Sequence, residues 1–162
     1  MFIWFAAASF LIVVMVFDSP AVDYRMVMLG AVAPVLEGAV AGPWLLHTLV
    51  GCAAVFIIVV IATRGRRLAA RRAIGLPIGL FLHLVLDGTW LNSSLFWWPF
   101  GGGRPLSDGG IPEFDHLAAS VALEVLGVAI AIFLIRRYEL TQPDRRREFI
   151  RTGRLARAVM RR

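Results

Sequence analysis

The sequence predicts an all-α integral membrane protein, and three observations support this fold class. Hydrophobic residues make up 59% of the 162-residue chain, whereas charged residues make up only 17%. The mean hydropathy of +0.74 is well above the value typical of a soluble domain. Several apolar runs are about as long as a helix that crosses a bilayer. We therefore expect one transmembrane helical domain over residues 1–140 and a basic tail over residues 141–162.

The apolar runs predict four transmembrane helices. These spans cover residues 2–17, 47–63, 73–91 and 117–135. The first run has neither the basic start nor the small-residue cleavage site of a secretory signal, so we interpret it as a helix that stays in the membrane. Cys52 is the single cysteine and lies inside the second run, which excludes a disulfide framework and favours a packing role.

Residues 26–46 form an apolar segment with several interruptions. Gly30, Pro34, Glu37 and Pro43 all fall within it, and such residues are typical of a broken helix. We expect a re-entrant or half-inserted segment here, and a fifth full span is the alternative. Non-helical backbone at membrane depth needs protein or water as a partner, so the segment also suggests a cavity.

The charge pattern predicts how the chain is oriented. The net charge is +6, and all 17 basic residues are arginine. The arginines gather between residues 64 and 72 and after residue 135, beside apolar runs, which argues against nucleic acid and for a cytoplasmic location of both regions. Both termini are therefore expected in the cytoplasm. Residues 18–46 and 92–116 are expected on the opposite side.

The tail predicts a basic amphipathic helix from about Asp144 onward, lying on the inner leaflet and held by anionic membrane lipid. Its apolar residues would share one side of such a helix, and they are Phe149, Ile150, Ala156, Val159 and Met160. A disordered basic tail is the alternative interpretation.

The third predicted span carries polar groups on one helix face. Gly75, Gly79, His83 and Asp87 follow each other at four-residue spacing, so they form one stripe. The two glycines would allow a neighbouring helix to approach closely. His83 and Asp87 would then lie near the outer end of the helix. Ionisable groups at membrane depth are costly and usually mark a functional site.

Other ionisable groups are expected on the same outer side. His47 begins the second span, and Glu37 precedes it. Neutral imidazole and carboxylate groups are the usual ligands of zinc. We therefore expect His47, His83, Asp87 and Glu37 to bind a divalent metal ion, most simply zinc. Alternatively, His83 and Asp87 only form hydrogen bonds that join helices.

Weaker candidates for the same site are Asp23, His116 and Glu124. Asp108 and Asp115 lie in the outer loop, where a solvated surface explains them equally well. Trp97, Trp98 and Phe100 fit an interfacial aromatic belt, and Trp98 is also a substrate-binding candidate. The sequence contains no nucleophile elbow, phosphate-binding loop or dinucleotide fingerprint that would indicate other chemistry.

Three segments resemble a family of small bacterial inner-membrane proteins, the YdjM-like membrane-bound metal-dependent hydrolases. "DYRMVMLGAVAPVLE" is similar to the family's Gly-Ala-Leu-Leu-Pro-Asp-x-Asp segment, "LLHTL" to its Thr-His-Ser segment, and "HLVLDG...FWWPF" to its His-x-x-x-Asp helix with a following Trp-Pro. The resemblance implies metal ligands at Glu37, His47, His83 and Asp87. Two positions depart from the pattern, since Val35 replaces the first aspartate and Gly42 an additional histidine.

Two functions follow as hypotheses. The first is a metal-dependent hydrolase with Asp87 and Glu37 as catalytic groups, acting at the extracytoplasmic face on a lipid-linked or amphiphilic substrate. A phosphoester is the expected bond, because Arg25 or Arg104 could hold a phosphate by forked hydrogen bonds. The second is a non-catalytic membrane subunit that binds a partner protein or anionic lipid, which the departures at Val35 and Gly42 favour.

Overall fold

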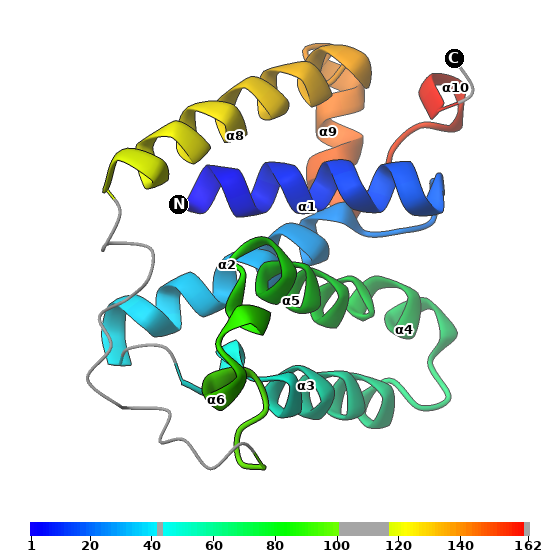
Figure 1. Ribbon diagram of the computed structural model, residues 1–162. Helices are drawn as coiled ribbons and strands as arrows, with labels where there is room; N and C mark the ends of the chain where they lie inside the picture. The colour runs from blue at the N-terminus through cyan, green and yellow to red at the C-terminus, as the bar shows by residue number, and fades with distance from the viewer. Residues whose placement is uncertain (42–43, 101–116, 161–162) are drawn as a thin grey trace.

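The computed structural model describes residues 1–41, 44–100 and 117–160, which form helices and no strand (Figure 1). The all-α fold is therefore confirmed for this part of the chain. The longest helices are α1 (Phe2–Phe17), α2 (Tyr24–Ala41), α3 (Leu49–Ala62), α5 (Gly75–Leu86) and α8 (Leu117–Arg137). Shorter elements connect or follow them: η1 (Leu45–His47), α4 (Arg67–Ala73), η2 (Thr89–Leu91), α6 (Ser93–Phe96), α9 (Pro143–Thr152) and α10 (Arg157–Met160).

Two helical stretches among the described residues are long and apolar enough to cross a membrane. They are Arg67–Leu86, which joins α4 and α5, and Leu117–Arg137. Only 33% and 11% of their most apolar windows are buried inside the protein, whereas the core helix of a soluble protein would be mostly buried. The other two predicted spans are apolar helices of 16 and 14 residues. Crossing by four helices therefore stays a prediction.

Helix α2 runs without a break through Gly30 and Pro34, so the predicted interruption at these positions is wrong. Its 18 residues correspond to about 27 Å, close to the thickness of a bilayer's apolar core. Gly30 marks a close helix contact, because a Cβ atom there would lie 2.0 Å from the Leu76 carbonyl oxygen. Proline is tolerated in such apolar bundles because neighbouring groups satisfy the backbone it frees.

Contacts between α1 and α2 show that these helices are antiparallel. Phe5 packs against Ala31 near the end of α2, whereas the Phe10 ring stacks on Tyr24 at its start, with ring centroids 4.7 Å apart. Tyr24 and Phe10 also belong to the largest buried apolar cluster. The α1–α2 pair thus forms a helical hairpin.

Helix α5 is parallel to α2 and lies very close to it. A Cβ atom at Gly75 would lie 2.9 Å from the Asp23 carbonyl oxygen, and one at Gly79 would lie 1.9 Å from that of Val27. One turn further on, His83 Nδ1 lies 2.8 Å from the Ala31 carbonyl oxygen. The expected role of Gly75 and Gly79 in helix approach is therefore confirmed.

The directions of the remaining two long helices, α3 and α8, follow from their contacts with α5 and α1. Helix α3 is antiparallel to α5, because His47, just before α3, faces His83, while Cys52 Sγ lies 3.8 Å from the Pro77 carbonyl oxygen. Helix α8 runs in the same direction as α1, because the start of α1 contacts Glu124 while Phe10, further along α1, stacks on Tyr138, just after α8, with ring centroids 6.3 Å apart. The backbone N–H groups of Ile3 and Trp4 donate to the Glu124 carboxylate, at 3.1 and 3.2 Å.

The bundle therefore has two chemically different ends. The arginine end comprises residues 18–24, 62–75 and 136–160, and the histidine end comprises residues 1–4, 35–37, 44–48 and 83–96. Met1 packs at the histidine end, whereas α10 lies at the arginine end (Figure 1). The expectation that both termini face the cytoplasm is thus incompatible with a bundle whose long helices all cross the membrane.

The tail forms two short helices that pack against the bundle, so the predicted basic helix from about Asp144 is present as α9 but does not continue through the tail, and its location on the inner leaflet stays a prediction. Helix α9 ends at Gly153, whose φ is +70°, and the Gly153 carbonyl accepts from the Tyr24 N–H at 2.8 Å. Leu155 and Val159 are buried in the largest apolar cluster. Four of the five apolar residues predicted to share one helix side belong to or pack against the same cluster: Phe149, Ala156, Val159 and Met160. The fifth, Ile150, is mainly exposed.

Candidate metal site

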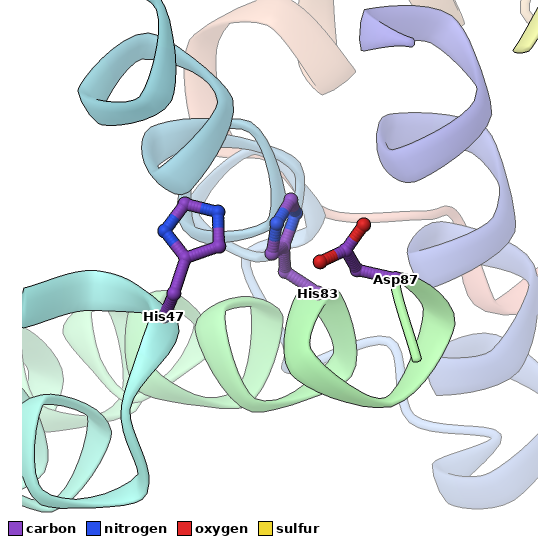
Figure 2. A group of neighbouring side chains, drawn as sticks. All are labelled: His47, His83 and Asp87. Carbon is purple, nitrogen blue, oxygen red and sulfur yellow. The ribbon is translucent and has the colours of Figure 1, made fainter. Parts of the chain in front are cut away.

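His47, His83 and Asp87 lie together at the histidine end (Figure 2). His47 ends the 3₁₀ turn η1, His83 lies in the last turn of α5, and Asp87 caps that helix. One ligand atom from each residue lies within 4.8 Å of the others. Both histidines are buried and Asp87 is half-buried. The grouping expected for these three residues is therefore present in the structure.

The Nδ1 atom of each imidazole lies within hydrogen-bond distance of an acceptor. His47 Nδ1 lies 3.2 Å from Glu37 Oε2, and His83 Nδ1 lies 2.8 Å from the Ala31 carbonyl oxygen. A carboxylate and a backbone carbonyl accept hydrogen bonds and do not donate them. In the neutral form, each ring would therefore carry its proton on Nδ1, and Nε2 would be the atom whose lone pair could coordinate a metal ion.

Hydrogen-bond acceptors for the ring nitrogen that does not bind the metal are characteristic of metal-binding histidines. A ligating histidine usually donates its other ring N–H to a carboxylate or a backbone carbonyl, and this fixes the tautomer and the ring orientation. His47 has the first kind of partner and His83 the second. The Phe5 ring packs against His83 with centroids 4.1 Å apart, so the ring has little freedom to rotate.

Asp87 is oriented by a residue that the sequence analysis missed. Thr89 is buried, and its Oγ1 donates to Asp87 Oδ2 at 2.7 Å. A hydroxyl two residues after an aspartate often bonds to it locally, so the Asp-Gly-Thr order was a usable signal. The Ala31 carbonyl and the Phe5 ring carry no such signal, because both reach the site only through helix packing.

A cavity of about 450 Å³ adjoins the cluster. His47 and Asp87 line it, and the other lining residues come from the segment that follows α5: Gly88, Thr89, Leu91, Asn92, Ser93 and Leu95. His83 lies behind His47 and Asp87 and is fully buried. A ligand in this cavity would therefore meet the two more accessible members of the cluster first.

The three residues fit a zinc-type ion. In a tetrahedral site with ligands 2.0–2.1 Å from the ion, two ligand atoms lie about 3.3–3.4 Å apart, so atoms that are now up to 4.8 Å apart would have to approach each other by up to about 1.5 Å. Two imidazole nitrogens and one carboxylate oxygen are donors that zinc prefers. Three protein ligands leave at least one coordination position open, which is the arrangement of catalytic rather than structural zinc sites.

Glu37 lies beside the cluster and orients it, although the sequence analysis placed it among the ligands and catalytic groups. Its carboxylate accepts from His47 Nδ1 and also from the Leu46 N–H, at 3.0 Å to the nearer oxygen. It therefore holds both the imidazole and the η1 turn. Val35, which replaces an aspartate of the YdjM-like pattern, is buried in an apolar cluster with Phe5 and Ala31.

The structure does not bring Arg25 or Asp23 to the site. They form an ion pair with each other, with Arg25 Nη2 and Asp23 Oδ2 2.8 Å apart. The Asp23 backbone packs against Gly75, which lies eight residues, or about 12 Å along the helix, before His83. Both residues belong to the arginine end, so the prediction that Arg25 holds a substrate at this site is wrong.

The remaining candidates lie elsewhere or outside the described residues. Glu124 caps the first turn of α1 and is therefore engaged in helix packing. Trp98 is half-buried and does not line the described part of the cavity. Arg104, Asp108, Asp115 and His116, like Gly42, lie outside the described residues.

Comparisons with protein-family models, with curated proteins and with solved structures found no match to this chain.

Proposed function

We propose that this protein is a membrane-embedded, metal-dependent hydrolase of the YdjM-like type. The observation that carries the proposal is the convergence of His47, His83 and Asp87 beside an open cavity. Buried histidines need hydrogen-bond partners in any role, so the support for a metal site is that three potential ligand atoms lie within 4.8 Å of one another and that both Nδ1 atoms have acceptors of the kind that ligating histidines use. The ion would be divalent, and zinc suits the donors best.

The proposed location is a bacterial inner membrane with five helices crossing it. The low burial of α8 and the apolar character of its exposed side chains support embedding in lipid. The arginine end would face the cytoplasm, according to the positive-inside rule. The histidine end, with its cavity, would then face the extracytoplasmic side, and α2 would be the fifth span.

This arrangement predicts that the two ends of the chain face opposite sides of the membrane. A reporter at Met1 should be extracytoplasmic, whereas reporters at Gly65 and after Met160 should be cytoplasmic, because α1 and α8 run in the same direction. Paired fusions to alkaline phosphatase and green fluorescent protein measure the location of each site. Cytoplasmic signals at both Met1 and Met160 would contradict five spans and favour the four-span topology.

The protein's own residues would have separate tasks in hydrolysis. His47, His83 and Asp87 would bind the ion. Glu37 would orient His47, and Thr89 would orient Asp87. When bound, a divalent ion would activate water and polarise the bond to be cleaved. Asn92 and Ser93 line the outer part of the cavity, where they could donate hydrogen bonds to a substrate.

The substrate would be lipid-linked or amphiphilic, because the cavity opens at the end of an apolar helical bundle. The more specific expectation of a phosphoester has lost one of its two supports, since Arg25 lies at the arginine end. The other support, Arg104, lies outside the described residues. The experiment below therefore tests both a carboxylic ester and a phosphoester as the bond that is cleaved.

A non-catalytic membrane subunit is the second candidate, and Val35 is the observation that favours it. Its burial among Phe5 and Ala31 leaves an apolar wall where the YdjM-like pattern has an aspartate. In this case the site would bind metal, or join helices, without hydrolysing a substrate, and the protein would serve a partner protein or anionic lipid.

The decisive experiment compares metal content and hydrolysis in the purified full-length protein. Wild-type protein should hydrolyse an amphiphilic probe, either 4-nitrophenyl decanoate or a fatty-alcohol ester of 4-nitrophenyl phosphate, and should lose this activity on chelation and regain it with zinc. Glu37→Gln should weaken zinc binding by about 10- to 100-fold, as losses of outer partners do. Stoichiometric zinc without hydrolysis of either probe would favour the subunit.

A further inference from the structure

A second cavity lies between α1, α2 and α8, away from the residues of the metal site. Its volume is about 390 Å³. Ala6 and Phe10 of α1, Val32 of α2 and Ala131 of α8 are among its walls, and every lining residue is apolar. Leu140 and Phe149, which follow α8, line it as well, and they belong to the arginine end. Phe2 and Ile3 line it too, so the cavity extends along the bundle from the first turn of α1 to the arginine end.

The walls of this cavity suit a hydrocarbon chain. A buried water molecule needs two to four polar partners, and the lining side chains offer none. Ile3 and Ile135 line the cavity and are each 42% exposed, so it opens onto the outer surface of the bundle. In the proposed membrane location, that surface is surrounded by lipid acyl chains.

Two arginines of the arginine end are close in the chain to residues that line the cavity. Arg136 directly follows the lining residue Ile135, and Arg146 precedes the lining residue Phe149 by three residues, on the same side of α9. Both are exposed. Within the described part of the chain, neither forms an ion pair, whereas Arg145 Nη1 pairs with Glu139 Oε2 at 2.6 Å.

We propose that this cavity binds one acyl chain of an anionic phospholipid, whose phosphate is held by Arg136 and Arg146. The apolar walls and the adjacent positive charges match the two parts of such a lipid. Arginine is well suited to the phosphate because its guanidinium group forms paired hydrogen bonds with phosphate oxygens. This site is separate from the metal cluster and does not depend on hydrolase activity.

The test measures lipid bound to the full-length protein by native mass spectrometry, with phosphatidylglycerol and phosphatidylcholine of identical chains. Wild-type protein should retain phosphatidylglycerol preferentially. The double variant R136Q/R146Q should lose this preference, by about fivefold for each arginine. The matched control R71Q/R72Q removes two exposed arginines of α4 that do not line the cavity, and it should keep the preference.

A second variant separates the cavity from the charges. Ala131→Leu places a larger side chain in the cavity and should reduce retention of both lipids while the protein remains folded. Equal loss of preference in R71Q/R72Q and R136Q/R146Q would overturn the proposal in favour of general charge attraction. Unchanged lipid retention in Ala131→Leu would overturn the assignment of the chain to this cavity.

Discussion

Replacing His83 with glutamine is expected to abolish stoichiometric metal binding while the helical bundle stays folded. His83 is one of three potential ligands, so its loss should weaken zinc binding by more than the roughly 100-fold upper range of outer-partner losses. The glutamine amide can still donate to the Ala31 carbonyl, which His83 Nδ1 now contacts at 2.8 Å. Zinc content per protein, from elemental analysis after purification, measures the effect.

Glu124→Gln provides the matched control for this experiment. Glu124 is also a polar group in an apolar helix, but its carboxylate accepts from the first N–H groups of α1. This variant should keep its zinc. Helix content from circular dichroism should be the same in both variants. Retention of one zinc per chain by folded His83→Gln would contradict the proposed site, and so would equal zinc loss in Glu124→Gln.

The sequence predicted the positions of the helices well, because uninterrupted apolar runs leave the backbone few alternatives in lipid. The first run was expected over residues 2–17, and α1 covers Phe2–Phe17. The fourth was expected over residues 117–135, and α8 covers Leu117–Arg137. Each of these helices is specified by local sequence, so no knowledge of its neighbours was needed.

Helix α2 shows where local sequence fails. Gly30 and Pro34 indicate a break when α2 is considered alone, yet Gly30 serves the contact with Leu76. Only the position of α5 reveals this role. The consequence is large, because crossing of the membrane by α2 would place the N-terminus on the side opposite to the one that four spans predict.

The packing of the tail against the bundle was not predicted for a related reason. A basic helix with one apolar face is equally compatible with lipid and with an apolar protein surface, since both remove the same side chains from water. Its apolar residues belong to the same cluster as Phe10, more than one hundred positions away in the chain, and Leu134, at least fifteen positions away. Sequence pattern alone does not identify that partner.

The site was predictable in its members and less so in their roles. His83 and Asp87 share a helix face because of their four-residue spacing, and that spacing is readable from the sequence. The role of Glu37 depends on the turn that carries His47 back toward the end of α2. Because this turn brings His47 Nδ1 within 3.2 Å of Glu37, the carboxylate orients a ligand and is not grouped with the ligands themselves.

The close approach of α2 and α5 connects the fold to the site, and Gly79→Ala tests it. The added Cβ atom would lie 1.9 Å from the Val27 carbonyl oxygen, and backbone atoms there have little freedom to move. We expect a loss of about 3 kcal/mol or more, at the upper end of the cost of overpacking, even though alanine favours the helix by about 1 kcal/mol. Thermal unfolding in detergent measures this loss.

The same substitution should also weaken metal binding, because the helices can separate only by moving Ala31 away from His83, one turn beyond the clash. Gly65→Ala is the control: it makes the same chemical change where no atom lies within 4 Å, and its cost should be only the backbone strain of a φ near +77°, about 1–2 kcal/mol. If Gly79→Ala unfolds no earlier than Gly65→Ala and keeps its zinc, then α2 and α5 are not in backbone contact. The position of His83 would then depend on its other neighbours, Phe5 and His47, rather than on the glycine contact.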